Sequence, residues 1–147
     1  MDIRVQQAPF DFGAEASAFS QGHDKVGAIV TFTGIVRDAD SGGLATMEIE
    51  HYPGMTEAAL TEIAEQACAR WSLADALIIH RYGVLRPGEQ IMMVATASRH
   101  RKDAFEAAEY LMDYLKSRAP FWKKEHGADG SQWVAARDED EEALTRW

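Results

Sequence analysis

The sequence predicts an α+β fold, organised as a single domain over residues 1–147. Three observations lead to this prediction. The 147 residues, 46% of them apolar, are enough to enclose one hydrophobic core. Several short runs are rich in β-branched residues, and two longer segments repeat apolar residues at helical spacing. Paired strands combined with two long helices are typical of the α+β class.

The first predicted strand is "VGAIVTFTGIV" (26–36), which is rich in β-branched and aromatic residues. The loop "DADSGG" (38–43) separates it from a second strand, "LATMEIEHY" (44–52), which ends at Pro53-Gly54. In the second strand alternate side chains point to opposite faces, with Met47, Ile49 and His51 on one face and Glu48, Glu50 and Tyr52 on the other.

The first long helix is predicted from Thr56, which can cap it, to about Trp71. Its apolar stripe consists of Leu60, Ile63, Ala64, Ala67, Cys68 and Trp71. The second helix is predicted from about residue 99 to 118, and Pro120 ends it because the residue before a proline avoids the α region. The apolar stripe of the second helix consists of Ala104, Phe105, Ala108, Leu111, Met112 and Leu115.

Between these helices, "ALIIHRYG" (76–83) and "QIMMVATAS" (90–98) predict two strands joined by a turn at "LRPGE". After the second helix, "SQWVAA" (131–136) predicts a short strand. The final segment "DEDEEALTRW" (138–147) predicts a short helix, because its acids come first and Arg146 comes late, as the helix dipole favours.

Composition narrows the classes of function. The formal net charge of −9 argues against general nucleic-acid binding, which needs a broad basic surface. No apolar run approaches the length of a membrane span and no secretory signal is visible, so we expect a cytoplasmic protein that does not engage a membrane. The single cysteine, Cys68, excludes an internal disulfide and is expected to be a buried small hydrophobe. We expect no metal and no cofactor, since no HExxH, CxxC, Walker A or GxSxG motif is present.

The basic residues are concentrated in one region. Residues 99–124 hold seven basic and four acidic residues, a net charge of +3, whereas the remainder carries −12. Four residues, Arg99, His100, Arg101 and Lys102, occupy the expected first turn of the second helix. That end of a helix already carries partial positive charge, so a bound phosphate would stabilise what is otherwise an unfavourable arrangement. The alternative is that these side chains extend into water or meet acids elsewhere.

Two lysines near the end of this region are candidates for chemistry. Lys116 falls on or beside the apolar stripe of its helix, where a lysine is unusual. It either extends its ammonium to water along the stripe, or it is desolvated beside other cations with a lowered pKa suited to acid–base or covalent work. If the segment from Phe121 is extended, Lys123 shares a face with Phe121 and points opposite to Trp122.

Two further residues are weighed individually. Arg37 ends the first strand at the edge of a loop, a position that often carries function. His51 lies on the apolar face of its strand and is expected to be a hydrogen-bonded core histidine.

His100 and Lys116 are about 24 Å apart along one helix, at ~1.5 Å per residue. Either there are two sites, or two subunits of a symmetric dimer each supply one end of a composite pocket.

Five segments in order resemble the large, catalytic subunit of molybdopterin synthase: "TFTGIVRD", "EIEHYPGMTE", "HRYGVLRPGE", "SRHRKDAFEA" and "MDYLKSRAPFWKKE". The resemblance runs from roughly residue 26 to the C-terminus and includes "WVAARD". It implies an α/β hammerhead fold with mixed and antiparallel strands. It also implies a sulfurtransferase of molybdenum cofactor biosynthesis, whose substrate is cyclic pyranopterin monophosphate.

The resemblance also implies partners. The family forms a central homodimer, and a small ubiquitin-like sulfur carrier docks at each end to give a heterotetramer. The carrier's C-terminal Gly-Gly carries a thiocarboxylate that enters the pocket of the large subunit. Two sulfurs are delivered in turn, the cyclic phosphate opens, and molybdopterin leaves. The sulfur comes from the carrier, so Cys68 need not take part.

Matched by motif, the resemblance implies catalytic roles for Lys116 and Lys123. It implies substrate binding by these two lysines and by Ile35, Val36, Arg37, His100, Arg101, Lys124, Glu125 and Arg137. His100, Arg101 and Arg37 are expected to hold the phosphate, and the pterin to lie near aromatic side chains. Some relatives have lysine where Ile35 stands, so its side chain need not act. Arg137 resembles an arginine that reaches the neighbouring subunit's pocket.

Two other functions fit the basic segment. A non-catalytic phosphate- or nucleotide-binding module would use the same helix start, and Lys116→Ala would then weaken binding with no reaction to lose. A scaffold that docks an acidic partner would bind it in a salt-sensitive way and would have no affinity for a small phosphate.

Overall fold

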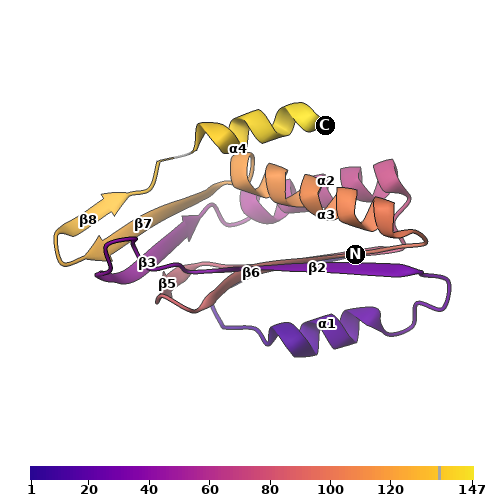
Figure 1. Cartoon of the computed structure of the whole chain (residues 1–147), viewed down its shortest axis with the longest axis horizontal. Helices are drawn as coiled ribbons and strands as arrows, with labels where there is room; N and C mark the ends of the chain where they lie inside the picture. The colour runs from indigo at the N-terminus through magenta and orange to yellow at the C-terminus, as the bar shows by residue number, and fades with distance from the viewer. Residues whose placement is uncertain (136) are drawn as a thin grey trace.

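The computed structural model describes residues 1–135 and 137–147. The chain builds two four-stranded sheets and two long helices, with a short helix near each end (Figure 1). This confirms the predicted α+β class. The described residues include no helix that is both long and apolar enough to cross a membrane.

The first sheet contains β1 (Asp2–Gln6), β4 (Asp75–Arg81), β6 (Gln90–Ser98) and β2 (Ala28–Ile35), in the order β1-β4-β6-β2. The pair β1 and β4 is parallel and the other two pairs are antiparallel. Helices α2 (Met55–Trp71) and α3 (Arg101–Ser117) cover one face, and α1 (Phe12–Ser20) covers the other (Figure 1). With both faces covered, every residue from Ile91 to Ser98 is buried.

The second sheet is fully antiparallel, in the order β5-β3-β7-β8. It consists of β3 (Leu44–His51), β5 (Gly83–Leu85), β7 (Phe121–Gly127) and β8 (Gly130–Trp133). The chain passes from β4 to β5 through Tyr82 alone, and Gly83 has φ of +91°, a conformation that side-chain-bearing residues rarely adopt. The two sheets therefore meet where β4 ends, and β7 lies beside the end of α3 (Figure 1).

Most predicted elements are present within a few residues. The strands at 26–36 and 44–52 are β2 and β3, and the two long helices are α2 and α3. The predicted final helix is α4 (Asp138–Ala143) followed by a 3-10 turn, Leu144–Arg146. The short strand predicted at 131–136 is β8, which ends at Trp133, and Ala136 lies outside the described residues. Elements β1, α1 and β5 were not predicted, and the segment that forms β7 (Phe121–Gly127) was considered only as a possible extended segment.

Three local predictions were wrong. Gly54, not Thr56, precedes α2, and the Glu57 carboxylate accepts the Gly54 N–H at 2.6 Å. The Thr56 hydroxyl instead donates to the Tyr52 carbonyl oxygen at 2.7 Å, which ties the helix to the end of β3. Phe105 is 62% exposed rather than buried, because Ala104, Ala107 and Ala108 form the contact face of α3 at that level. Cys68 is only half-buried, and burial raises the pKa of its thiol.

Candidate functional site

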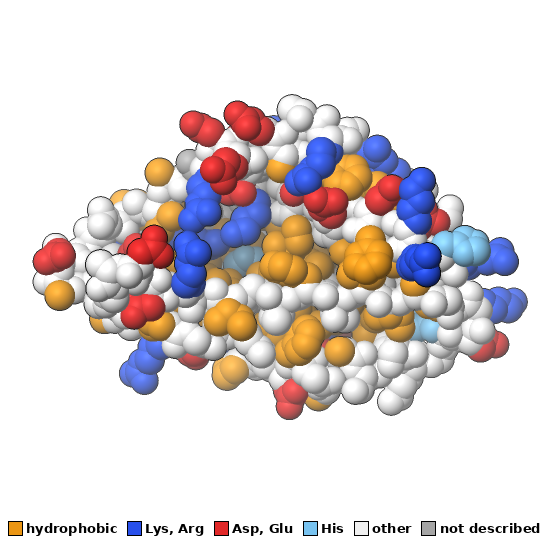
Figure 2. Space-filling model, viewed as in Figure 1, with side chains coloured by type: hydrophobic (Ala, Val, Ile, Leu, Met, Phe, Trp, Pro, Cys, Tyr) orange, Lys and Arg blue, Asp and Glu red, His pale blue; other side chains and the backbone are white. Residues whose placement is uncertain are grey.

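A pocket opens where α3 ends and the two sheets meet, with a volume of about 150 Å³. In the space-filling view it is a hollow with basic side chains at one end and apolar side chains along its length (Figure 2). Its walls come from β2, β4, β6, α3 and β7, and the lining residues are Phe32, Gly34, Ile35, His80, Ile91, Met92, Met112, Leu115, Lys116, Ala119, Phe121 and Lys123. The register between β2 and β6 shifts between Gly34 and Ile35, so an irregularity in the sheet lies at this pocket.

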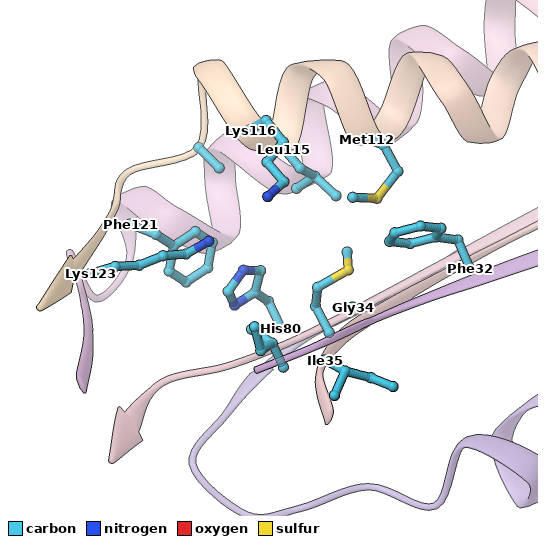
Figure 3. Close-up of a pocket in the computed structure, with 12 residues that line it drawn as sticks. Phe32, Gly34, Ile35, His80, Met112, Leu115, Lys116, Phe121 and Lys123 are labelled. Atoms are coloured by element: carbon cyan, nitrogen blue, oxygen red, sulfur yellow. The ribbon is translucent and has the colours of Figure 1, made fainter. Parts of the chain in front are cut away.

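The two lysines extend into the same space from different elements (Figure 3). Lys116 comes from the last turn of α3 and is exposed, which agrees with the first of the two alternatives, an ammonium that extends to water. Lys123 comes from β7 and is half-buried. As predicted from strand alternation, Lys123 shares the pocket face with Phe121, whereas Trp122 is exposed and packs edge-on against Tyr52.

The environment of Lys123 perturbs its protonation. Burial lowers the pKa of Lys123 to about 8, because the charged ammonium is costly to desolvate. The positive charge of Lys116 lowers it further, as does that of Arg137, while Asp140 partly offsets the effect. Near neutral pH this amine can therefore release and regain a proton, a property suited to acid–base chemistry.

His80 lies at the base of the pocket, a position that the sequence analysis did not identify as functional. Its ring is buried, and Phe121 stacks on it with the ring centroids 3.7 Å apart and the planes 15° from parallel. Burial is the main cause that lowers the pKa of His80 to about 3, and the charges of Lys123 and Lys116 act in the same direction. One signal was available: His80 is a polar residue inside the apolar run "ALIIHRYG".

Other predicted site residues lie in different surroundings. Ile35 is among the residues that border the pocket. The Val36 side chain is buried, and its backbone N–H donates to the Glu89 carbonyl oxygen at 2.9 Å. Arg37 is exposed at the start of the loop after β2.

Strand alternation separates the residues after Lys123. Lys124 lies with its ammonium 5.2 Å from the centroid of the Trp133 ring. Glu125 is half-buried on β7, opposite Met47 of β3. Arg137 is exposed immediately before α4 and close enough to Lys123 to affect the pKa of that lysine.

His100 and Arg101 lie at the opposite end of α3 from Lys116. Figure 2 shows a second basic group with a histidine at that end of the face. The helix begins at Arg101, so Arg99 and His100 precede its first turn rather than occupying it as predicted. His51 is hydrogen-bonded as predicted, with Nδ1 3.1 Å from the Thr56 hydroxyl, and its ring packs against Tyr82.

The chemistry available at the pocket is that of paired amines beside an apolar cavity. The amines can hold an anion, and Lys123 can exchange a proton. Among the described residues there is no cluster of three or more His, Cys, Asp or Glu side chains that could hold a metal ion.

Comparison with known proteins identifies a matching family and several similar proteins. Residues 5–118 match the family model described as "MoaE protein". The "Molybdopterin synthase catalytic subunit" of Cereibacter sphaeroides is 65% identical over 147 residues, which is 100% of each chain.

Solved structures share the architecture. The "Molybdopterin biosynthesis MoaE protein" of Burkholderia ambifaria has a TM-score of 0.85 at 52% identity, covering 99% of this chain and 97% of its own. A complex of subunits 1 and 2 of molybdopterin-converting factor from Helicobacter pylori has a TM-score of 0.78 at 20% identity, with 92% and 91% covered. At that identity the likeness shows the fold alone.

Proposed function

The chain belongs to the MoaE family, and from this membership we propose that it acts as the catalytic subunit of molybdopterin synthase. It is a sulfurtransferase of molybdenum cofactor biosynthesis. In this role it moves two sulfurs from a thiocarboxylated carrier protein to cyclic pyranopterin monophosphate. The observation that carries the chemical assignment is the convergence of Lys116 and Lys123 on one apolar-walled pocket.

The two lysines take different parts because their surroundings differ. Lys116 is exposed at the pocket and keeps its charge in contact with water, which suits the approach of an anionic thiocarboxylate. In the pocket it steadies the oxyanion that forms when the carrier's acyl group is displaced. Lys123, with its pKa lowered to about 8, moves protons as sulfur attacks.

The pocket suits the end of an extended chain together with a flat ring. Apolar side chains from β2, β6 and α3 line it, and Phe32 and Ile35 are 43% and 54% exposed on β2. A carrier that buries these side chains would bring its Gly-Gly terminus to the lysines.

The phosphate is held by basic residues from two regions. His100 and Arg101 lie at the far end of α3 from Lys116, so one chain does not bring all of these groups to one small ligand. We propose a homodimer in which each subunit supplies His100 and Arg101 to the other subunit's lysines, with Arg37 as a further phosphate contact. With a carrier at each end the assembly is a heterotetramer.

A cytoplasmic location and a single folding domain over residues 1–147 remain predictions.

A single-turnover assay tests the assignment. The protein is mixed with a thiocarboxylated carrier and cyclic pyranopterin monophosphate, and dithiolene formation is followed. We expect product from the wild type and a rate reduced by about 10²-fold or more in Lys116→Ala, the scale of a lost acid–base or charge-stabilising group. The matched control is Lys25→Ala, which removes the same charge from an exposed side chain before β2 that does not line the pocket.

Each other outcome has a definite meaning. Equal rates in the wild type and Lys116→Ala would transfer the main role to Lys123. No product from the wild type, with a carrier that is active in another synthase, would support the non-catalytic phosphate-binding module instead. In that case Lys116→Ala would weaken phosphate binding and change no reaction.

A further inference from the structure

His80 presents an unpaired nitrogen to the pocket. Its Nδ1 lies 2.8 Å from the carbonyl oxygen of Arg81, and a carbonyl oxygen can only accept a hydrogen bond. Nδ1 therefore carries the proton, and Nε2 carries a lone pair. Nε2 makes no hydrogen bond to any described residue. It is also not fully enclosed by protein, because among the described residues Arg4 Nε is the only fully enclosed side-chain nitrogen or oxygen that lacks a hydrogen bond.

The position of the ring is fixed on several sides. His80 is opposite Val5 of β1 and Met92 of β6, and it is only 6% exposed. Phe121 covers one face of the imidazole in a parallel stack. A ring held in this way keeps Nε2 in one place, which is what a specific hydrogen bond requires.

The ring remains neutral across the working pH range. The titratable groups near it are Lys123 on β7, Lys116 on α3 and His51 on β3, and each of them opposes a positive charge on the imidazole. Burial acts in the same direction, so the pKa of His80 lies at about 3. Nε2 is therefore an acceptor and not a donor at neutral pH.

This acceptor differs in kind from the other polar groups at the pocket. Among the side chains that line it, the lysines present N–H donors and the two methionines present only weak sulfur acceptors. A ligand N–H or O–H group that enters here and is not paired would lose its hydrogen bonds to water, at a cost in affinity.

We propose that His80 is a specificity-determining residue, whose Nε2 accepts a hydrogen bond from a ring N–H or O–H group of the bound heterocycle. The lysines select the anionic parts of the ligand, and His80 selects a donor on its ring. This inference rests on the proposed function for the identity of the heterocycle, and its experiment measures binding without the carrier, so a failure of sulfur transfer does not bear on it.

Two variants of similar size test the hydrogen bonds of the two His80 ring nitrogens independently. In His80→Asn the side-chain amide can still donate to the Arg81 carbonyl oxygen but has no atom at the Nε2 position. In His80→Gln the longer side chain can place its carbonyl oxygen near that position. Both variants lose the stack on Phe121, so the difference between them reports the acceptor. The control is His51→Phe, because His51 is a nearby histidine that does not line the pocket.

The measurement is calorimetric binding of cyclic pyranopterin monophosphate, of analogues methylated at each ring nitrogen in turn, and of inorganic phosphate. We expect His80→Asn to bind the parent compound about tenfold or more weakly, the scale of one lost buried hydrogen bond. We expect its affinity for inorganic phosphate to be unchanged. The wild type, His80→Gln and His51→Phe should discriminate against one methylated analogue, and His80→Asn should not.

The preference of the wild type for the parent compound over that methylated analogue should also be independent of pH between 5 and 8, because the His80 ring stays neutral there. The proposal is overturned if His80→Asn keeps the wild-type preference among the analogues. It is also overturned if parent compound and phosphate lose affinity equally, since that pattern would mean a general distortion of the pocket.

Discussion

Lys123 shows how one side chain can serve function at a cost to the fold. Its ammonium is half-buried beside Lys116 and Arg137, and no acid at hydrogen-bond distance pairs with it among the described residues. A group whose pKa is about 8 in the folded chain and about 10.5 when unfolded binds fewer protons in the folded state between those values. Its penalty is therefore full below pH 8 and disappears as the pH rises toward 10.5.

Lys123→Met should accordingly stabilise the protein at pH 7. We expect the free energy of unfolding to rise by about 1–2 kcal/mol, less than the full pKa shift implies because the side chain keeps some contact with water. The gain should shrink at pH 9.5, where the wild-type amine is already mostly neutral. Urea unfolding of both proteins at the two pH values measures this.

Lys124→Met is the control for that experiment, because it removes the same charge from the next residue of β7, whose ammonium lies over the Trp133 ring. A Lys123→Met variant that is less stable than the wild type at pH 7 would mean that packing by the lysine stem outweighs the desolvation of its charge.

At the residue scale, the sequence predicted correctly which side chains share a face of a strand, but it predicted less well which side chains are buried. Strand alternation correctly put Lys123 with Phe121 and Trp122 on the other side. Helical spacing put Lys116 and Phe105 at or beside a buried stripe, and both are exposed. Spacing gives the angle around a helix axis, but what covers that angle depends on strands elsewhere in the chain.

At the scale of elements, the C-terminal segment that begins with α4 is anchored by its last residue. The Trp147 ring packs edge-on against Trp71 and Tyr110, and its indole nitrogen donates to Asp113 at 2.6 Å. Arg146 adds ion pairs to Glu109 and Asp113 of α3. Arg137 immediately precedes this segment, so its position near the pocket depends on an anchor ten residues away.

Trp147→Ala should loosen this segment while the sheets remain intact. We expect a loss of about 2 kcal/mol in unfolding free energy, from lost aromatic area and one lost hydrogen bond. Amide hydrogen exchange should accelerate in residues 138–146 and stay slow in β4 and β6. Unchanged protection in 138–146 would mean that the Arg146 ion pairs suffice to hold the segment.

The elements that the sequence missed share a physical reason. Strand β1 is five residues long and is held by a parallel pairing with β4, far away in sequence. Strand β5 has three residues and becomes a strand only because β3 lies alongside it. Helix α1 has a weak apolar pattern, and it contributes Phe19 to the core on the lower face of the first sheet. Local patterns cannot report partners that are distant in the chain.

At the scale of the whole molecule, the functional residues fall at two ends of α3. The sequence predicted this separation from helix length alone, because residues 100 and 116 must lie far apart on one helix. The pocket itself could not be predicted, because it forms where two sheets meet and its walls come from five separate elements.

Mixing two inactive variants tests the composite pocket. Lys116→Ala and Arg101→Ala damage opposite ends of α3, so a mixed dimer has one pocket with both defects and one with neither. With random exchange half of the dimers are mixed, and we expect activity to recover to about a quarter of the wild-type value.

The control pairs Lys116→Ala with Lys123→Ala, which alter the same end and leave no intact pocket in any dimer. Recovery in that control, or none in the first mixture under conditions where mass spectrometry detects mixed dimers, would contradict a pocket shared between subunits.

An amine with a pKa of about 8 is also a chemical handle. At pH 8 roughly half of the Lys123 side chains are the free base, whereas an ordinary lysine with a pKa near 10.4 is less than about 1% free base. The chain has only five lysines, so an amine-reactive acylating reagent at limiting dose would label Lys123 in preference to the other four lysine side chains. The desolvation that destabilises the fold therefore also makes the Lys123 amine reactive toward a labelling reagent. A ligand bound in the pocket would be detected as a loss of that label.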